Sequence, residues 1–208
     1  IPEHYPHELL AGMESDAHFR PPADFRELEL YCYRVAGVVG LMMTHVMGVS
    51  SEAALRSACD LGIAMQLTNI ARDVRSDFEI GRCYLPAELL ASHGLNPSNY
   101  FKQENRAALT RAVNDLLDHA DRYYRSGEAG TVYLSPRSSL VILIARHAYS
   151  RIGRKVRTAG VRAWDQRQFT STFEKIGSFF KAGAQWLGQW RHRSAWSPVS
   201  ISAIWRFS

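Results

Sequence analysis

The chain has 208 residues, of which 46% are apolar and 22% are charged, and a domain of this size buries about 70% of its unfolded surface. It contains no uninterrupted apolar run of about 18 residues and no charged-then-apolar leader, so the sequence predicts neither a membrane-spanning helix nor a secretory signal. The net charge of +5 is compatible with nucleic acid, an anionic membrane surface or a phosphorylated substrate.

The cysteines bear on the compartment of the protein, and the first residues bear on where the chain begins within its gene product. Cys32, Cys59 and Cys83 are odd in number and far apart, which argues against a disulfide framework and against zinc spacing, and favours a reducing cytoplasm. The chain starts with Ile1 in the proline-punctuated segment IPEHYPHELL. We therefore expect a cytoplasmic protein whose sequence here begins inside a longer gene product.

Helical periodicity recurs along the chain and no convincing alternating strand is found, so the predicted class is all-α. We predict helices at about 6–16, 24–47, 51–77, 104–126, 136–159 and 167–191. Ser50 or Ser51 offers an N-cap, and SHGLNPSNY reads as a loop. Without repeats, residues 1–208 are expected to form one bundle, with about 192–208 as a frayed tail.

Small residues interrupt the helix predicted at 24–47. Ala36, Gly37 and Gly40 stand in YCYRVAGVVGLMM, where each helical glycine costs about 1 kcal/mol relative to alanine. Two explanations remain open. The small residues allow another helix to approach closely, or they leave space for an apolar ligand chain.

Polar side chains recur at four-residue spacing in the next predicted helix. Asn69, Asp73 and Asp77, extended by Gln66, lie on one stripe because residues four apart are about 5–6 Å apart at Cβ. The stripe is either a solvated helix edge or a cation site. Oxygen ligands of this kind suit Mg²⁺ or Mn²⁺, which in turn bind a polyanionic substrate head.

Basic residues flank this stripe. Arg72 and Arg75 are expected beside it rather than on it, and GRCYLP turns the chain at Gly81 so that Arg82 and Tyr84 return toward the acidic end of the helix. Arg82 either pairs with Asp77 or binds a phosphate, and the sequence does not separate these two roles.

Three segments together resemble a known family: YCYRVAGVVGLMM, LGIAMQLTNIARDVRSDFEIGRCYLP and YSRIGRKVRTAGVRAWDQRQ. They are similar to the head-to-head trans-isoprenyl diphosphate synthases, which comprise the phytoene, squalene and dehydrosqualene synthases, and the similarity to the bacterial phytoene synthases is greatest. The resemblance extends to about residue 185. It implies an isoprenoid-synthase-type helical bundle around a central apolar cavity.

The resemblance also implies a role for individual residues. Asn69, Asp73 and Asp77 match the second aspartate-rich motif, NxxxDxxxD, and are expected to bind Mg²⁺ (or Mn²⁺) and the diphosphate. Diphosphate-binding assistance is expected from Gln66, Arg72 and Arg167, while Arg82 keeps its two alternative roles. Tyrosines facing the reaction centre are expected to be Tyr31, Tyr84 and Tyr149. The small-residue pattern itself, rather than the resemblance, leads us to expect that Val35, Ala36, Val39, Gly40 and Met43 contact the apolar chain of a ligand.

One motif of the family has no match in the chain. The first aspartate-rich motif, DxxxD, is not found, because Glu14 and Asp16 are too close together, while Asp115, Asp118 and Asp121 fit the solvated face of a helix. We therefore expect this motif upstream of Ile1. The chain then corresponds to the C-terminal two-thirds of the enzyme and is expected to be inactive by itself.

For the intact enzyme, the resemblance implies Mg²⁺-dependent condensation of two geranylgeranyl diphosphates through prephytoene diphosphate to phytoene, in carotenoid biosynthesis. Squalene or dehydrosqualene formation from farnesyl diphosphate is the alternative within the family. A noncatalytic binding or assembly module is the alternative of another class.

The C-terminal region combines aromatic and basic residues. From Ser171 onward there are five lysines and arginines against the single acidic residue Glu174, while Phe179, Phe180, Trp186, Leu187 and Trp190 recur at helical spacing. These aromatics either close the bundle or lie in a membrane interface, which would place the protein on the inner face of the membrane. No nucleic-acid recognition motif accompanies the charge, so no nucleic-acid partner is expected.

Overall fold

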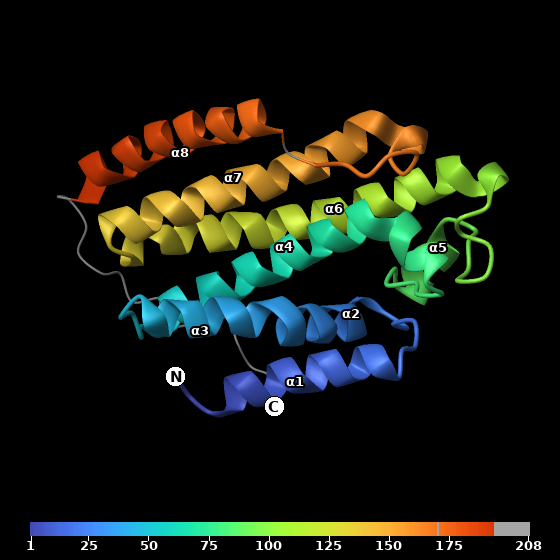
Figure 1. Ribbon diagram of the computed structural model, residues 1–208, viewed down its shortest axis with the longest axis horizontal. Coiled ribbons are helices and arrows are strands. Elements are labelled where there is room, and N and C mark those ends of the chain that lie inside the picture. Colours follow the sequence, from blue (N-terminus) through green and yellow to red (C-terminus); the bar gives the residue numbers. More distant parts are fainter. Residues whose placement is uncertain (170, 194–208) are drawn as a thin grey trace.

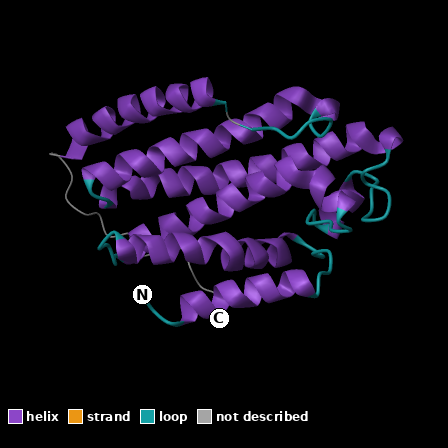
Figure 2. Ribbon diagram, viewed as in Figure 1, coloured by secondary structure: helices purple, strands orange, loops and turns teal. Residues whose placement is uncertain are grey.

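The computed structural model describes residues 1–169 and 171–193. In this part of the chain all regular elements are helical (Figure 2), which confirms the predicted all-α class. The α-helices are α1 (His4–Ala17), α2 (Phe25–Cys32), α3 (Val38–Val46), α4 (Glu52–Glu79), α5 (Ala87–Ser92), α6 (Arg106–Ala129), α7 (Pro136–Ala159) and α8 (Thr172–Arg193). A π-helical turn, η1 (Tyr33–Gly37), and the 3₁₀ turns η2 (Gln103–Asn105), η3 (Gly130–Tyr133) and η4 (Gly160–Arg162) complete the set.

The predicted helices differ from the observed ones mainly at their ends. The segment predicted as one helix at 24–47 is divided by the π-helical turn η1, and the short α5 was not predicted. Ser51, rather than Ser50, caps α4, since its hydroxyl accepts from the Ala54 amide at 3.3 Å. The α8 helix begins at Thr172 rather than near 167, and most of the predicted tail, residues 194–208, lies outside the described residues.

The central element of the bundle is α4 (Figure 1). It contacts α6 and α7 on one side and α3 with η1 on the other, while α1 covers α3 and η1 from outside, and α8 lies on α7. Leu67, Ala64 and Ala71 of α4 are completely buried against α6 residues such as Leu116. Burial of a leucine of this kind stabilises the fold by about 1.5–3 kcal/mol, so the acidic stripe is carried by a rigid helix.

The loop after η4 is fixed to α4 by a buried tryptophan. Trp164 is 2% exposed, and its indole Nε1 donates to the carbonyl of Ala71 at 2.9 Å. This contact holds the following residues, including Arg167, close to the acidic stripe. Among the described residues, no helix has both the length and the apolar character needed to cross a membrane.

Candidate metal and diphosphate site

An apolar cavity of about 350 Å³ lies beside α4, between η1 with α3 and the segments of α6, η3 and α7 that face them. The five residues predicted to contact a substrate chain all line it: Val35, Ala36, Val39, Gly40 and Met43. Val39 is 39% and Met43 is 46% exposed, so the cavity is not closed on the side of α3. The predicted apolar ligand space is therefore present in the fold.

The glycines around the cavity also bring helices together. A Cβ atom on Gly40 would lie 2.3 Å from the carbonyl oxygen of Ala58, and one on Gly62 would lie 2.4 Å from that of Ala36. No side chain fits at these distances. Gly40 permits the close approach of α3 to α4, which confirms the first explanation, and it also lines the cavity that the second explanation requires.

The polar end of the cavity is formed by Gln66, Asn69 and Tyr149. The Asn69 amide Nδ2 donates to Gln66 Oε1 at 3.3 Å, as their shared stripe predicts. The Asn69 Oδ1 atom is buried and has no hydrogen-bond partner among the described residues. An unpaired buried carbonyl oxygen costs free energy, and a cation is a ligand that would satisfy it.

Asp73 is held by two arginines. Arg72 Nε donates to Asp73 Oδ1 at 2.8 Å, and Arg167 donates from Nε to Oδ1 at 3.0 Å and from Nη2 to Oδ2 at 3.2 Å. Burial raises the pKa of Asp73, but these hydrogen bonds and the two positive charges outweigh it and hold the pKa below its ordinary value. Asp73 therefore remains a carboxylate at neutral pH.

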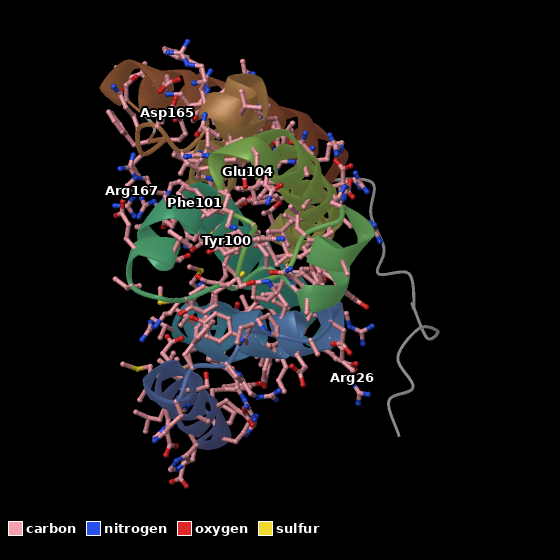
Figure 3. All side chains as sticks on the ribbon, turned by 90° about the vertical axis from the view of Figure 1, so that its right-hand side faces the viewer. Arg26, Tyr100, Phe101, Glu104, Asp165 and Arg167 are labelled. Carbon is pink, nitrogen blue, oxygen red and sulfur yellow. The ribbon has the colours of Figure 1, made fainter. Side chains whose placement is uncertain are left out.

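Three arginines lie at or beside the acidic stripe. Arg72 occupies a helix position beside the acidic stripe, as predicted, and its guanidinium reaches across to the carboxylate of its neighbour Asp73. Arg75 also lies beside the stripe and pairs with Glu79 at 2.8 Å. Figure 3 looks onto this end of the bundle and shows Arg167 at its edge, with its side chain 67% exposed.

The carboxylate of Asp77 differs from that of Asp73 both in its partners and in the direction of its pKa shift. No side chain of the described residues forms a hydrogen bond or ion pair with its carboxylate. Burial and the negative charges of Asp73 and Asp16 raise its pKa to about 6, although Arg82 and Arg72 act in the other direction. A half-buried carboxylate without a partner is a suitable ligand for an added cation.

Arg82 does not form the predicted ion pair with Asp77. Its Nη2 atom donates to the backbone carbonyl of Asp16 at 2.8 Å, and Nη1 lies 3.9 Å from Asp16 Oδ1. The proposed pairing with Asp77 is therefore replaced by pairing with Asp16. The sequence analysis assigned Asp16 no role, because Asp16 lies too close to Glu14 to form a DxxxD motif with it.

The three tyrosines fall into two groups. Tyr31 and Tyr84 are stacked, with ring centroids 5.0 Å apart, and both donate to Asp16. Burial raises the pKa of both phenols, and the Asp16 charge acts in the same direction. Tyr149 lines the 350 Å³ cavity from α7 instead. The structure thus does not bring all three rings to one cavity.

The residues present fit a divalent cation that shares its coordination with a substrate. Within residues 1–169 and 171–193, no three His, Cys, Asp or Glu side chains form a metal-binding group. Asn69, Asp73 and Asp77 nevertheless offer oxygen atoms along one stripe. Mg²⁺ commonly takes only one or two carboxylates and fills its other positions with phosphate and water.

Comparison with known proteins gives a consistent result. The sequence model described as squalene/phytoene synthase matches residues 1–174. The chain is 55% identical over 176 residues to a phytoene synthase of Pseudescherichia vulneris, an alignment that covers 85% of this chain and 57% of that protein. It is 49% identical over 181 residues to a 15-cis-phytoene synthase of Enterobacter agglomerans, covering 87% of this chain and 61% of that protein.

Solved structures show the same fold. A dehydrosqualene synthase in complex with ligand matches with a TM-score of 0.73 and 26% identity, over 89% of this chain and 65% of the other. The squalene synthase HpnC from Alicyclobacillus acidocaldarius matches with a TM-score of 0.73 and 20% identity, over 77% of this chain and 61% of the other. The chain thus spans about 57% to 61% of the two named phytoene synthases.

Proposed function

Because the chain belongs to the squalene/phytoene synthase family, we propose that it forms part of a phytoene synthase. The enzyme would condense two geranylgeranyl diphosphates to prephytoene diphosphate and then to phytoene, in carotenoid biosynthesis. Curated relatives with this name support the proposal at 55% and 49% identity. A reducing cytoplasm is the proposed location.

The observation that supports the proposal most directly is that the apolar cavity is continuous with the polar stripe of α4. We call this stripe the oxygen ladder; it consists of Gln66, Asn69, Asp73 and Asp77. Gln66 and Asn69 line the cavity, and Asp73 and Asp77 continue the same stripe beyond it. A ligand with an apolar chain and an anionic head would place each part in a matching environment. Prenyl diphosphates have this form.

The polar residues of the site would then stabilise the diphosphate as it leaves the substrate. Asn69, Asp73 and Asp77 would hold Mg²⁺ or Mn²⁺, which supplies positive charge to the departing diphosphate when bound. Arg72 and Arg167 would donate hydrogen bonds to diphosphate oxygens, as guanidinium groups do in charge-assisted pairs. Gln66 would orient Asn69 through their shared hydrogen bond.

The aromatic and apolar residues would protect the carbocation left behind. Tyr149 would present its electron-rich ring face from the 350 Å³ cavity itself, whereas Tyr31 and Tyr84 would act from the separate cavity beside Asp16. Each ring face is worth about 0.5–2 kcal/mol to a nearby cation. The cavity residues Val35, Ala36, Val39, Gly40 and Met43 would exclude water from it. Arg82 would hold the Tyr84 hydroxyl, to which it donates at 3.2 Å.

The proposal is tested by product analysis. The chain is studied alone and in an extended form, in which the part of the Enterobacter agglomerans relative that the chain does not span is joined to it. Both are incubated with Mg²⁺ and geranylgeranyl or farnesyl diphosphate, and the hydrocarbons are extracted. Phytoene from the extended form supports the proposal, whereas no hydrocarbon from either substrate would favour a noncatalytic module.

A second candidate has one specific observation in its favour. The dehydrosqualene synthase structure matches at 26% identity over 89% of this chain, so a farnesyl diphosphate substrate is the competing assignment within the family. Faster turnover of farnesyl than of geranylgeranyl diphosphate, with squalene or dehydrosqualene as the product, would establish it.

We also propose that the outer face of α8 contacts a membrane surface. Gln185 bonds His147 at 2.8 Å, Ser178 and Ala182 are buried, and Trp186 donates to the Pro136 carbonyl at 2.9 Å. The apolar residues left on the outside are Ile176, Phe179, Phe180 and Leu187. Aromatic side chains next to basic ones such as Lys181 suit an anionic lipid interface. The Trp190 side chain lies outside the described part of the chain.

A further inference from the structure

Asp16 connects three segments that are far apart in the sequence. It is the penultimate residue of α1, and its side chain is 28% exposed. One carboxylate oxygen accepts a hydrogen bond from Tyr84 at 2.7 Å, and the other accepts one from Tyr31 at 3.2 Å. A single carboxylate therefore joins α1, α2 and the turn that follows α4.

Arg82 completes this arrangement. It donates to the Asp16 carbonyl at 2.8 Å and to the Tyr84 hydroxyl at 3.2 Å, while its Nη1 atom is 3.9 Å from the Asp16 carboxylate. The Tyr84 hydroxyl consequently donates to one charged group and accepts from another, which fixes its direction. Replacement of the carboxylate would remove the common acceptor of the two phenols and the anionic partner of the guanidinium.

The rings held in this way have an open side. Tyr31 and Tyr84 are stacked at 5.0 Å and 27°, and Phe19 meets Tyr84 edge to face at 5.0 Å. Together with Asp16, these rings line a second cavity of about 220 Å³. The orientation of the pair toward this cavity depends on where their hydroxyl groups are bound.

We propose that Asp16 is a positioning residue, which fixes the Tyr31 and Tyr84 rings and the Arg82 guanidinium for the reaction. The inference rests on the proposed function, because the ring positions matter to turnover only if a carbocation forms beside them. Catalytic groups must be held within about 0.5 Å of their productive geometry. A displacement of about 1 Å can lower turnover by about 100-fold.

The test compares Asp16→Asn with Glu14→Gln in the extended form. Glu14 is exposed on the same helix two residues earlier, so its change removes an equal charge without touching the tyrosines. We expect kcat of Asp16→Asn to fall by about 10- to 100-fold with KM changed by less than about threefold, whereas Glu14→Gln stays within about twofold of wild type. Asp16→Asn should also lower kcat less in a Tyr84→Phe background than in wild type, since it acts through Tyr84.

Asp16→Glu provides a second variant that retains the charge and displaces the oxygen atoms. A kcat near that of wild type for either folded Asp16 variant, or an equal effect of Asp16→Asn with and without Tyr84, would overturn the positioning role. Failure of the proposed function gives a different result, in which the wild-type extended form releases diphosphate from neither substrate. That result would reject the positioning role of Asp16 together with the proposed function.

Discussion

Arg167 forms two hydrogen bonds with Asp73, which lies 94 residues earlier in the chain, at 3.0 and 3.2 Å. The pair joins the loop after η4 to the centre of the oxygen ladder. Because Arg167 is 67% exposed whereas Asp73 is 16% exposed, the guanidinium can be withdrawn into solvent much more easily than the carboxylate. An exposed guanidinium paired with a largely buried carboxylate is suited to transfer to an incoming diphosphate.

Arg167→Ala should therefore affect ligand binding more than stability. The free energy of unfolding is expected to change by less than about 1 kcal/mol, as for other exposed ion pairs. Binding of inorganic pyrophosphate in the presence of Mg²⁺, measured by calorimetry, should weaken by about tenfold. Arg162→Ala is the matched control, because Arg162 is 85% exposed and lies in the same region. Equal effects of the two substitutions would reject a diphosphate role for Arg167.

Asp77→Asn should change the pH dependence of stability in a defined direction. The folded pKa of Asp77 is raised from its ordinary value of 3.8 to about 6, so the folded state binds the proton more tightly and loses stability as pH rises from about 4 to 6. In metal-free buffer the variant should be more stable than wild type by about 1–2 kcal/mol at pH 7, after allowance for partial exposure. The difference should vanish near pH 4.

Asp73→Asn is the control for that experiment, because the pKa of Asp73 is shifted in the opposite direction and the effect of pH on stability is therefore reversed. The pKa of Asp73 is lowered by Arg72 and Arg167 against the effect of burial, so its carboxylate stabilises the fold at neutral pH and loses this effect as pH falls below about 4. Urea unfolding between about pH 2.5 and pH 7.5 covers the predicted changes of both variants. The same pH dependence for the two would show that their environments do not differ as described.

Two glycine-to-alanine substitutions should change the stability of the fold in opposite directions. Gly40→Ala would place Cβ 2.3 Å from the Ala58 carbonyl oxygen, whereas the space around Gly183 in α8 is open for 4 Å. We expect Gly40→Ala to destabilise the fold by about 1–3 kcal/mol through overpacking. Gly183→Ala should stabilise it by up to about 1 kcal/mol through helix propensity. Thermal unfolding of both variants tests whether α3 and α4 approach as closely as the structure indicates.

The outer face of α8 can be tested with vesicles. The double variant Phe179→Ser/Phe180→Ser should reduce cosedimentation with anionic vesicles by at least about tenfold, because the two side chains are 49% and 69% exposed and would enter the interface. Phe169→Ser changes an equally exposed ring outside α8 and should have little effect. Added salt should weaken binding through screening of the basic residues. Binding that survives the double variant would leave α8 with a packing role alone.

Sequence patterns predicted those parts of the fold and site that depend on local spacing. Spacings of three and four residues placed Gln66, Asn69, Asp73 and Asp77 on one stripe, and Ala36 and Gly40 of the second helical segment do line a cavity. The Ser51 cap and the bounds of α7 were also accessible from local sequence.

Contacts between distant segments were not accessible in this way. The pairing of Arg82 with Asp16 instead of Asp77 depends on how α1 meets the turn after α4, a contact over 66 residues. The return of Arg72 onto Asp73 depends on a choice of rotamer that spacing does not encode. The π-helical turn η1 required knowledge of tertiary packing, because Tyr33–Gly37 has ordinary helical periodicity.

The most direct test of the oxygen ladder as a metal and diphosphate site is the rate of diphosphate release from geranylgeranyl diphosphate by the extended form. Asp73→Asn and Asp77→Asn are compared with Glu79→Gln, an exposed acidic residue at the end of the same helix, in the presence of Mg²⁺ and after chelation. We predict that both aspartate variants lose at least about 100-fold in kcat, that Glu79→Gln retains the wild-type rate, and that chelation abolishes turnover. Near-normal, Mg²⁺-dependent phytoene formation by folded Asp73→Asn or Asp77→Asn would contradict the assignment.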